Sequence, residues 1–160
     1  MNIFAHPDKE TVLRILRDAD LPIADITEQH LIHFFGCGAE SNPYGIVGIE
    51  PYGEIALLRS LAVVPSRQGT GIGTYLVKNA EQYAFRQGVK SLYLLTTTAQ
   101  PFFKRLGYID AARTEAPLSI RNTKEFSGTC PVSSVFMIKQ LSTNPSFHPT
   151  SVPLARDLDG

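Results

Sequence analysis

A glycine-rich turn carries the clearest chemical signal in this sequence. Gln68, Gly69, Thr70, Gly71, Ile72 and Gly73 follow the apolar run 54–64 and precede a run in which apolar residues recur at helical spacing. Glycine lets backbone approach a ligand closely, and the first N–H groups of a helix are unpaired and partly positive. The turn therefore indicates a pyrophosphate site at a strand-to-helix junction.

Two familiar phosphate motifs do not fit these glycines. A dinucleotide fingerprint needs G-x-G-x-x-G with an acidic residue about 20 positions later, and a P-loop needs G-K-[ST]. The glycines here stand at Gly69, Gly71 and Gly73, and no lysine follows them directly.

Arg59 is an unusual charge inside an aliphatic strand, where an unpaired guanidinium is costly to bury. A carboxylate, phosphonate or arsonate of a substrate could bind its two-pronged face, and Arg121 could close over the same anion. The alternative is an internal ion pair, with Glu54 or Glu125. The sequence leaves both interpretations open.

Two acids flank the turn Pro51-Tyr52-Gly53, and either could act on an amine. An alkylammonium with a pKa near 10.4 costs roughly 4.6 kcal/mol to neutralise at pH 7, so amine chemistry needs a base or desolvation. We expect Glu50, in preference to Glu54, to accept the proton. Tyr52 is expected to orient the substrate. Alternatively, both acids simply solvate a hairpin and the tyrosine packs as a lid.

Metal-ligand patterns are weak. His30 and His33 are three residues apart with no evident third ligand, and Cys37 and Cys130 lack C-x-x-C spacing. We therefore expect no metal, and reduced thiols in a cytoplasmic protein.

Periodicity and punctuation indicate an α/β chain whose strand–helix–strand unit brackets the glycine turn. A helix cap is expected at Asp25-x-x-Glu28. The expected elements are a strand at 2–4, a helix from about 7 to 21, a short helix or strand start near 31–35, a strand end and turn over 36–45, strands at 46–50 and 54–64 joined by a hairpin, a helix at 72–87, a buried strand at 91–98 parallel to 54–64, a helix at 99–106, a strand at 108–112, an irregular stretch at 115–128 and a strand at 132–141.

Length and composition suit one globular domain of residues 1–141, followed by a flexible tail of residues 142–160 with Pro, Ser and Thr. The chain has 160 residues, 43% of them hydrophobic and 19% charged, and its 15 basic and 15 acidic residues cancel. No basic stripe suggests nucleic acid. The apolar runs are too short to span a membrane, and no leader pattern begins the chain.

Leu61-Ala62-Val63, Pro65 and the glycine turn together resemble the GNAT superfamily of acetyl-CoA-dependent N-acetyltransferases. The stretch 96–108 is similar to that fold's later acetyl-CoA motif. Segments 50–63, 115–126 and 130–131 resemble the arsenic-resistance N-acetyltransferase group. The resemblance implies a GNAT fold of class α/β (α+β): a mixed, mostly antiparallel sheet of about six or seven strands, a V-shaped split between two parallel strands, and about four flanking helices.

The same resemblance implies where acetyl-CoA binds. Many GNATs place a proton-donating tyrosine where this chain has Phe103, so water, Tyr108 or Tyr93 would have to protonate the leaving thiolate. The implied acetyl-CoA residues are Leu61, Ala62, Val63, Gln68, Gly69, Thr70, Gly71, Ile72, Gly73, Thr98, Phe103 and Lys104, with Arg105 a further candidate.

The expected function is transfer of acetyl from acetyl-CoA to the primary amine of a small, acidic, amino-acid-like molecule, in its sharpest form an amino-acid arsenical or its phosphorus analogue. Acetylation of a protein or peptide amine and a non-catalytic acetyl-CoA or amino-acid sensor are the alternatives. The expected partner is a small-molecule amine, with neither nucleic acid nor membrane, and the chain is a monomer or a homodimer.

Overall fold

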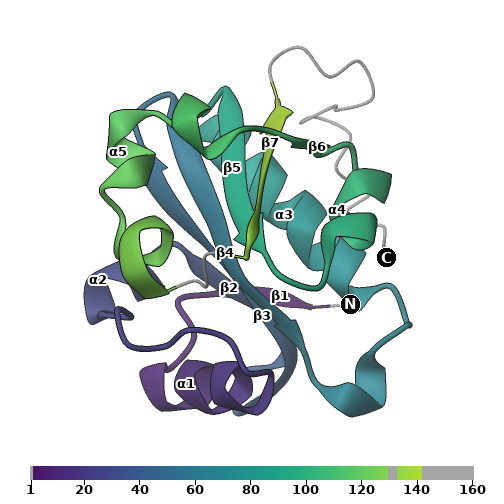
Figure 1. The fold of residues 1–160 in the computed structure, drawn as a ribbon. Helices are drawn as coiled ribbons and strands as arrows, with labels where there is room; N and C mark the ends of the chain where they lie inside the picture. The colour runs from purple at the N-terminus through teal and green to yellow at the C-terminus, as the bar shows by residue number, and fades with distance from the viewer. Residues whose placement is uncertain (1, 130–132, 142–160) are drawn as a thin grey trace.

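Seven strands form one mixed sheet in the order β1-β2-β3-β4-β5-β7-β6 (Figure 1). The computed structural model describes residues 2–129 and 133–141, so the expected tail and Cys130 lie outside the described residues. The strands are β1 (Ile3–Ala5), β2 (Phe34–Ala39), β3 (Asn42–Tyr52), β4 (Ile55–Val63), β5 (Ser91–Thr96), β6 (Ile109–Asp110) and β7 (Val135–Gln140).

One neighbouring pair, β4 and β5, is parallel, and the others are antiparallel. The pairing of β4 with β5 covers only Ile55–Leu57 against Ser91–Tyr93. Both strands continue beyond these residues, to Val63 and Thr96. The two strands therefore diverge at their carboxyl ends, which confirms the predicted fold with its V-shaped split.

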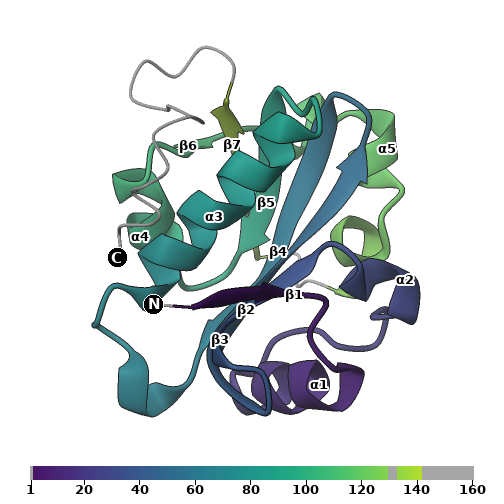
Figure 2. The same ribbon diagram turned by 180° about the vertical axis from the view of Figure 1, so that it is seen from behind.

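Helices cover both faces of the sheet. Figure 2 shows α3 crossing the face seen from behind, and Figure 1 shows α1, α2 and α5 on the other side. The helices are α1 (Lys9–Asp18), α2 (Glu28–Leu31), α3 (Ile72–Arg86), α4 (Gln100–Arg105) and α5 (Leu118–Arg121), with 3-10 turns η1 (Pro65–Arg67) and η2 (Arg113–Glu115) and a π-helical turn η3 (Glu125–Thr129). No helix among the described residues is both long and apolar enough to cross a membrane.

Strand alternation sends neighbouring residues to different cores. In β4, Leu58 packs under α3 with Leu76 and Val77, whereas Leu57 faces the other side. On that other side two separate cores form. One surrounds α1, where Ile15 and Leu16 are buried, and the second contains Ile120 of α5. The sheet surface between these two cores carries the candidate site.

A β-bulge interrupts β4 next to the split. Ile46 pairs with Ala62 but Gly48 pairs with Arg59, so Ser60 and Leu61 lie opposite the single residue Val47. Ser60 takes a left-handed φ of 60°. A bulge bends and twists its strand, so it contributes to the divergence of β4 from β5. Sequence periodicity predicted a regular strand here and did not reveal the bulge.

Three local predictions were wrong. The stretch 115–128 is not irregular, because it contains α5 and most of η3. The N-cap of α2 is Thr27, whose hydroxyl accepts from the His30 N–H while the His30 ring accepts from the Thr27 N–H, so the expected Asp25 cap is absent. Within the expected strand end and turn over 36–45, the turn is shorter than expected, because β2 runs to Ala39 and β3 begins at Asn42, which leaves only Glu40 and Ser41 between them.

Candidate functional site

A cavity of about 500 Å³ opens where β4 and β5 diverge. The loop after α1, the first residue of η3 and the residue before β7 contribute to its lining. The residues that line it are Ala19–Pro22, Leu58–Val63, Gln68, Leu94–Ala99, Phe103, Glu125 and Ser134. Six predicted acetyl-CoA residues are among them: Leu61, Ala62, Val63, Gln68, Thr98 and Phe103.

The β4 wall of this cavity can accept an extended ligand as an added strand. Beyond Leu57, β4 keeps its β3 partner but has no ladder contact with β5. Backbone groups on that side can bond the pantetheine arm, and an N–H near Ala62 or Val63 can hold negative charge on a thioester oxygen. Gln68 reaches back and donates to the Val63 carbonyl at 3.0 Å. That bond occupies one acceptor of this wall and anchors the glycine turn to it.

The glycine turn has the geometry of an anion site. Gly71 is the N-cap of the 15-residue helix α3 with φ 91°, and no side chain caps the helix. A Cβ built on Gly69 or Gly71 would meet no atom within 4 Å, so the backbone there is open on the outside. The free N–H groups of Ile72, Gly73 and their neighbours and the helix dipole suit a diphosphate. Thr70 is held by its hydroxyl, which donates to the Arg67 carbonyl.

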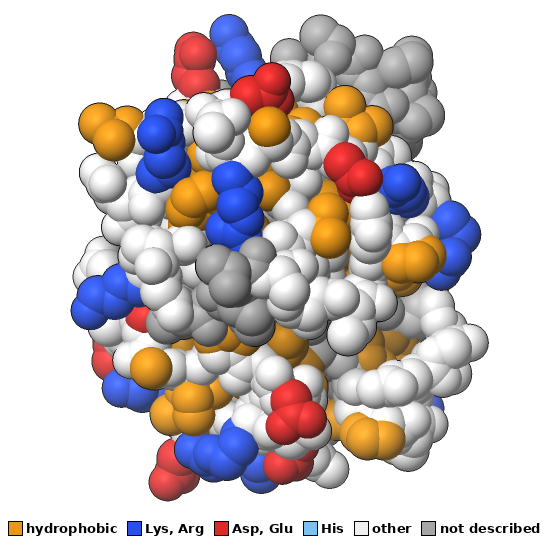
Figure 3. All heavy atoms as spheres, viewed as in Figure 1, with side chains coloured by type: hydrophobic (Ala, Val, Ile, Leu, Met, Phe, Trp, Pro, Cys, Tyr) orange, Lys and Arg blue, Asp and Glu red, His pale blue; other side chains and the backbone are white. Residues whose placement is uncertain are grey.

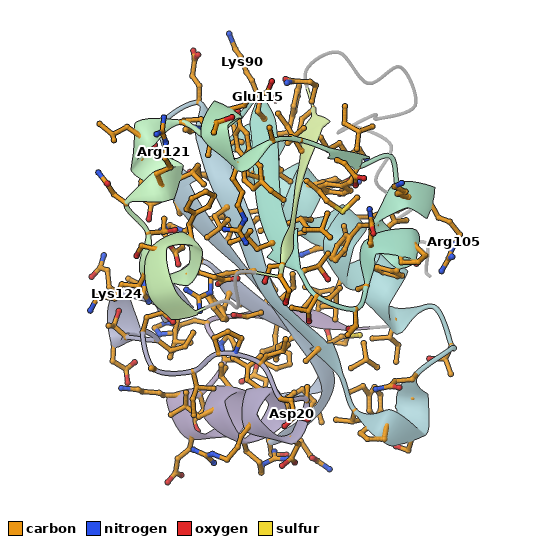
Figure 4. All side chains as sticks on the ribbon, viewed as in Figure 1. Asp20, Lys90, Arg105, Glu115, Arg121 and Lys124 are labelled. Carbon is orange, nitrogen blue, oxygen red and sulfur yellow. The ribbon has the colours of Figure 1, made fainter. Side chains whose placement is uncertain are left out.

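The later acetyl-CoA motif, residues 96–108, contributes apolar rather than charged side chains to the cavity wall. Phe103 is buried and packs edge-on against Phe102 and Tyr108. Lys104 is exposed and lies 3.6 Å from Asp110, and Arg105 points outward from α4 in Figure 4. Neither basic residue lines the cavity. Their contact with a ribose phosphate stays a prediction.

Arg59 lies on the cavity floor and is surrounded by carboxylates. Its side chain is 0% exposed. Both Nη atoms donate to Asp25, at 2.6 and 2.9 Å, Nη1 also donates to Glu50, and Nε lies 3.1 Å from Glu125. The internal pair foreseen as the alternative thus exists with Glu125 and not with Glu54. Sequence spacing did not reveal Asp25, which is 34 residues away.

These ion pairs determine the charge states of the cluster. Burial alone would lower the pKa of Arg59, but the Asp25 hydrogen bonds and the charges of Glu125 and Asp25 outweigh it and raise the pKa. Burial would raise the pKa of Asp25, yet the hydrogen bonds and charge of Arg59 lower it. Three carboxyl groups therefore surround one permanent cation, and the His30 ring lies 3.5 Å from one of them, Glu50.

The structure separates the two predicted catalytic acids. Glu50 is buried, and its oxygens accept from Tyr52 at 2.7 Å and from Arg59. Glu54 is exposed and lies 3.5 Å from Lys90, at the opposite end of β4 from Val63, roughly 30 Å away at about 3.3 Å per residue. Glu54 is therefore out of reach of an amine in the cavity. Burial and the Glu50 hydrogen bond also raise the pKa of Tyr52, so this phenol stays protonated.

Three other candidates lie away from the cavity. Arg121 is exposed on α5, where its Nε donates to the Ala116 carbonyl, and it does not join Arg59. Tyr108 is buried on the α3 side, and its hydroxyl donates to Glu81, which also binds Lys139. Tyr93 stacks on Phe136 in the α5 core. Neither tyrosine lines the cavity as a proton donor for the thiolate.

His30 has different neighbours from those expected. Asp25, His30 and Glu50 each offer a ligand atom within 4.8 Å of the others, so a third ligand exists beside His30. His33 is elsewhere, with Nδ1 2.6 Å from the Tyr83 hydroxyl. The oxygens of Asp25 and Glu50 already bind Arg59, whose charge opposes a metal ion at this point.

Comparison with known proteins agrees with this geometry. The model of the "Acetyltransferase (GNAT) family" matches residues 3–108. An amino-acid acetyltransferase of Ralstonia nicotianae is 36% identical over 104 residues, which cover 65% of this chain and 21% of that protein. This chain thus spans about a fifth of the length of that relative.

Solved structures share the fold at low sequence identity. N-acetylglutamate synthase from Neisseria gonorrhoeae, in complex with coenzyme A and N-acetyl-glutamate, superposes with a TM-score of 0.73 at 21% identity over 88% of this chain and 35% of that one. Rv2747 from Mycobacterium tuberculosis, in complex with CoA, gives a TM-score of 0.72 at 16% identity over 88% of this chain and 99% of that one.

Proposed function

Because this chain belongs to the GNAT family of acetyltransferases, we propose that it moves the acetyl group of acetyl-CoA to the primary amine of a small, amino-acid-like molecule. The observation that supports this most is the continuity of the site. One cavity runs along the free edge of β4, past Ala62 and Val63, to Gln68 at the glycine turn. A thioester bound along this edge would have its carbonyl group inside the cavity, where an amine can approach it.

The reaction is a direct displacement. The neutral amine attacks the thioester carbonyl carbon, a C–N bond forms, and the C–S bond breaks as the CoA thiolate leaves. A backbone N–H near Ala62 or Val63 would stabilise the oxyanion. Phe103 has no proton to give. The attacking nitrogen therefore loses its proton to water as the amide forms, and water returns a proton to the thiolate, whose pKa in solution is near 8.5. Glu50 is bound to Tyr52 and Arg59 and acts by holding Arg59 rather than by taking the amine proton.

The amino-acid-like acceptor is supported by the name of the Ralstonia nicotianae relative. An acidic version, including an amino-acid arsenical, was the finer expectation and depended on Arg59 as the anion-binding group. Such a substrate would have to displace a carboxylate of Asp25, Glu50 or Glu125 from a guanidinium that is already fully surrounded.

The test is product formation. Purified protein is mixed with acetyl-CoA and a panel of acidic, neutral and basic amino acids, amino-acid arsenicals, diamines and peptides, and acetylated products are identified by mass spectrometry. We expect an acetylated small amine and initial rates that fit a ternary complex, with intersecting double-reciprocal lines. Acetylated peptides alone would make the chain a protein acetyltransferase. Acetyl-CoA binding with no product from any amine would favour a sensor.

A further inference from the structure

We propose that the acceptor end of the cavity, by which we mean the part lined by Asp20, Arg59 and Glu125, selects a small amine that carries a second positive charge. Such an acceptor would be a diamine or a diamino acid, and dicarboxylic acceptors would be disfavoured. The inference rests on the proposed acetyl transfer and names its acceptor class. It follows from the charges that line the cavity.

Negative charge exceeds positive charge at this end. Asp20, Arg59 and Glu125 are the ionisable side chains among the described residues that line the cavity. Arg59 is also bound from behind by Asp25 and Glu50. The Arg59 guanidinium is thus paired with three carboxylates, and Asp20 adds a fourth acidic group. A cationic acceptor gains from this excess, whereas an acidic acceptor is repelled and meets, among the described residues that line the cavity, no cation other than the paired Arg59.

Ser134 provides a second, independent indication of a ligand. Its residue is 6% exposed, and its Oγ has no hydrogen-bond partner among the described residues. The carbonyl of the same residue accepts from Arg113 at 3.0 Å, so the backbone here is held in place. Ser134 lines the cavity together with Glu125. Hydroxyl and carboxylate oxygens are the hydrogen-bond acceptors that an ammonium group requires.

Asp20 is the second acidic residue that lines the cavity. It follows α1 with a left-handed φ of 58°, and its N–H donates to the Arg17 carbonyl at 3.1 Å. The next residue, Leu21, donates to the Leu16 carbonyl at 2.9 Å. The exposed carboxylate is therefore carried on a hydrogen-bonded turn. Two anionic positions in one cavity, one after α1 and one in η3, suit an acceptor with two cationic groups, one of which loses its proton to react.

Asp20→Asn is the informative variant, because asparagine tolerates left-handed backbone and the change removes only charge. Glu115→Gln is the matched control. Figure 4 shows Glu115 at the end of the molecule opposite Asp20, and it does not line the cavity. Binding is measured by titration calorimetry on protein saturated with CoA, which separates acceptor selection from turnover. The probes are 1,4-diaminobutane, ornithine, alanine and glutamate.

We expect the two basic probes to bind at least about tenfold more tightly than glutamate or alanine. Asp20→Asn should weaken the basic probes about three- to tenfold, a range set by one partly screened charge, and Glu115→Gln should leave them unchanged. Tighter binding of glutamate or alanine, no binding of either basic probe, or no effect of Asp20→Asn would overturn the proposal. Selective binding of the basic probes, together with no acetylated product from any amine when acetyl-CoA replaces CoA, would refute the proposed transferase function but support this selectivity.

Discussion

Replacement of Arg59 by methionine tests the charge cluster most directly. The substitution keeps an unbranched side chain of similar reach and removes the cation that Asp25, Glu50 and Glu125 share. These three carboxylates are 6%, 5% and 4% exposed. Removing one partner from a buried ion pair costs about 3–5 kcal/mol, because the remaining charge is left uncompensated. For a chain of this length, that is a loss of about 10–15 °C in melting temperature.

The pH dependence gives the prediction a second, sharper test. In the native protein the pKa of Asp25 lies below its ordinary value of 3.8, so its contribution to stability is full above that value and is lost as pH falls through the lowered pKa. Without Arg59, burial is the largest remaining influence, opposed only by a backbone hydrogen bond and the charge of His30, and it raises the folded pKa of Asp25. The variant should then gain stability as pH falls from 7 towards 4, so its deficit relative to the native protein is largest at pH 7.

The assay is urea unfolding followed by circular dichroism at pH 7, 6, 5 and 4. Arg121→Met is the matched control, since it removes an exposed arginine with one hydrogen bond to the Ala116 carbonyl and should cost about 1 kcal/mol or less. Asp25→Asn in the Arg59→Met background should recover part of the loss. A deficit below about 1 kcal/mol, or one that does not change between pH 7 and pH 4, would refute the reasoning.

Three further predictions concern the neighbouring groups. Glu50→Gln should destabilise the protein by about 1–3 kcal/mol in urea unfolding yet leave the acidic limb of the kcat/KM pH profile in place, and loss of that limb would identify Glu50 as the base. Gly71→Ala places a Cβ at φ 91° and should cost about 1–2 kcal/mol in thermal unfolding and raise the KM for acetyl-CoA, whereas Lys78→Ala on the same helix should change neither. Acetyl-CoA at about one hundred times its Kd should raise the free energy of unfolding by about 2.7 kcal/mol, and an unchanged melting curve would argue against the glycine-turn site.

Local sequence determined most of the elements and the cofactor half of the site. Apolar spacing at 3.6 residues located α1 and α3, and Gly53 and Gly88 marked where the β3–β4 hairpin turns and where α3 ends. The expected phosphate turn at Gln68–Gly73 does precede α3. These features are readable because the residues that define each of them are close neighbours in the chain.

The charge cluster could not be read in the same way. The burial cost of Arg59 required an anionic partner, and the sequence predicted one, but Asp25, Glu50 and Glu125 come from three different segments. A guanidinium can pair with a substrate or with the protein, and local sequence does not distinguish the two. Only the packing of the loop before α2 and of η3 against β4 decided the matter.

The sequence by itself thus determined the strand–turn–helix unit that suits a CoA diphosphate and the need for an anion beside Arg59. The tertiary structure alone decided which anions those are, where β4 bulges at Ser60, and that Glu54 and Arg121 lie away from the cavity. The physical reason is the range of the interactions. Helix periodicity and glycine backbone act within a few residues, whereas ion pairing and strand divergence depend on contacts between segments tens of residues apart.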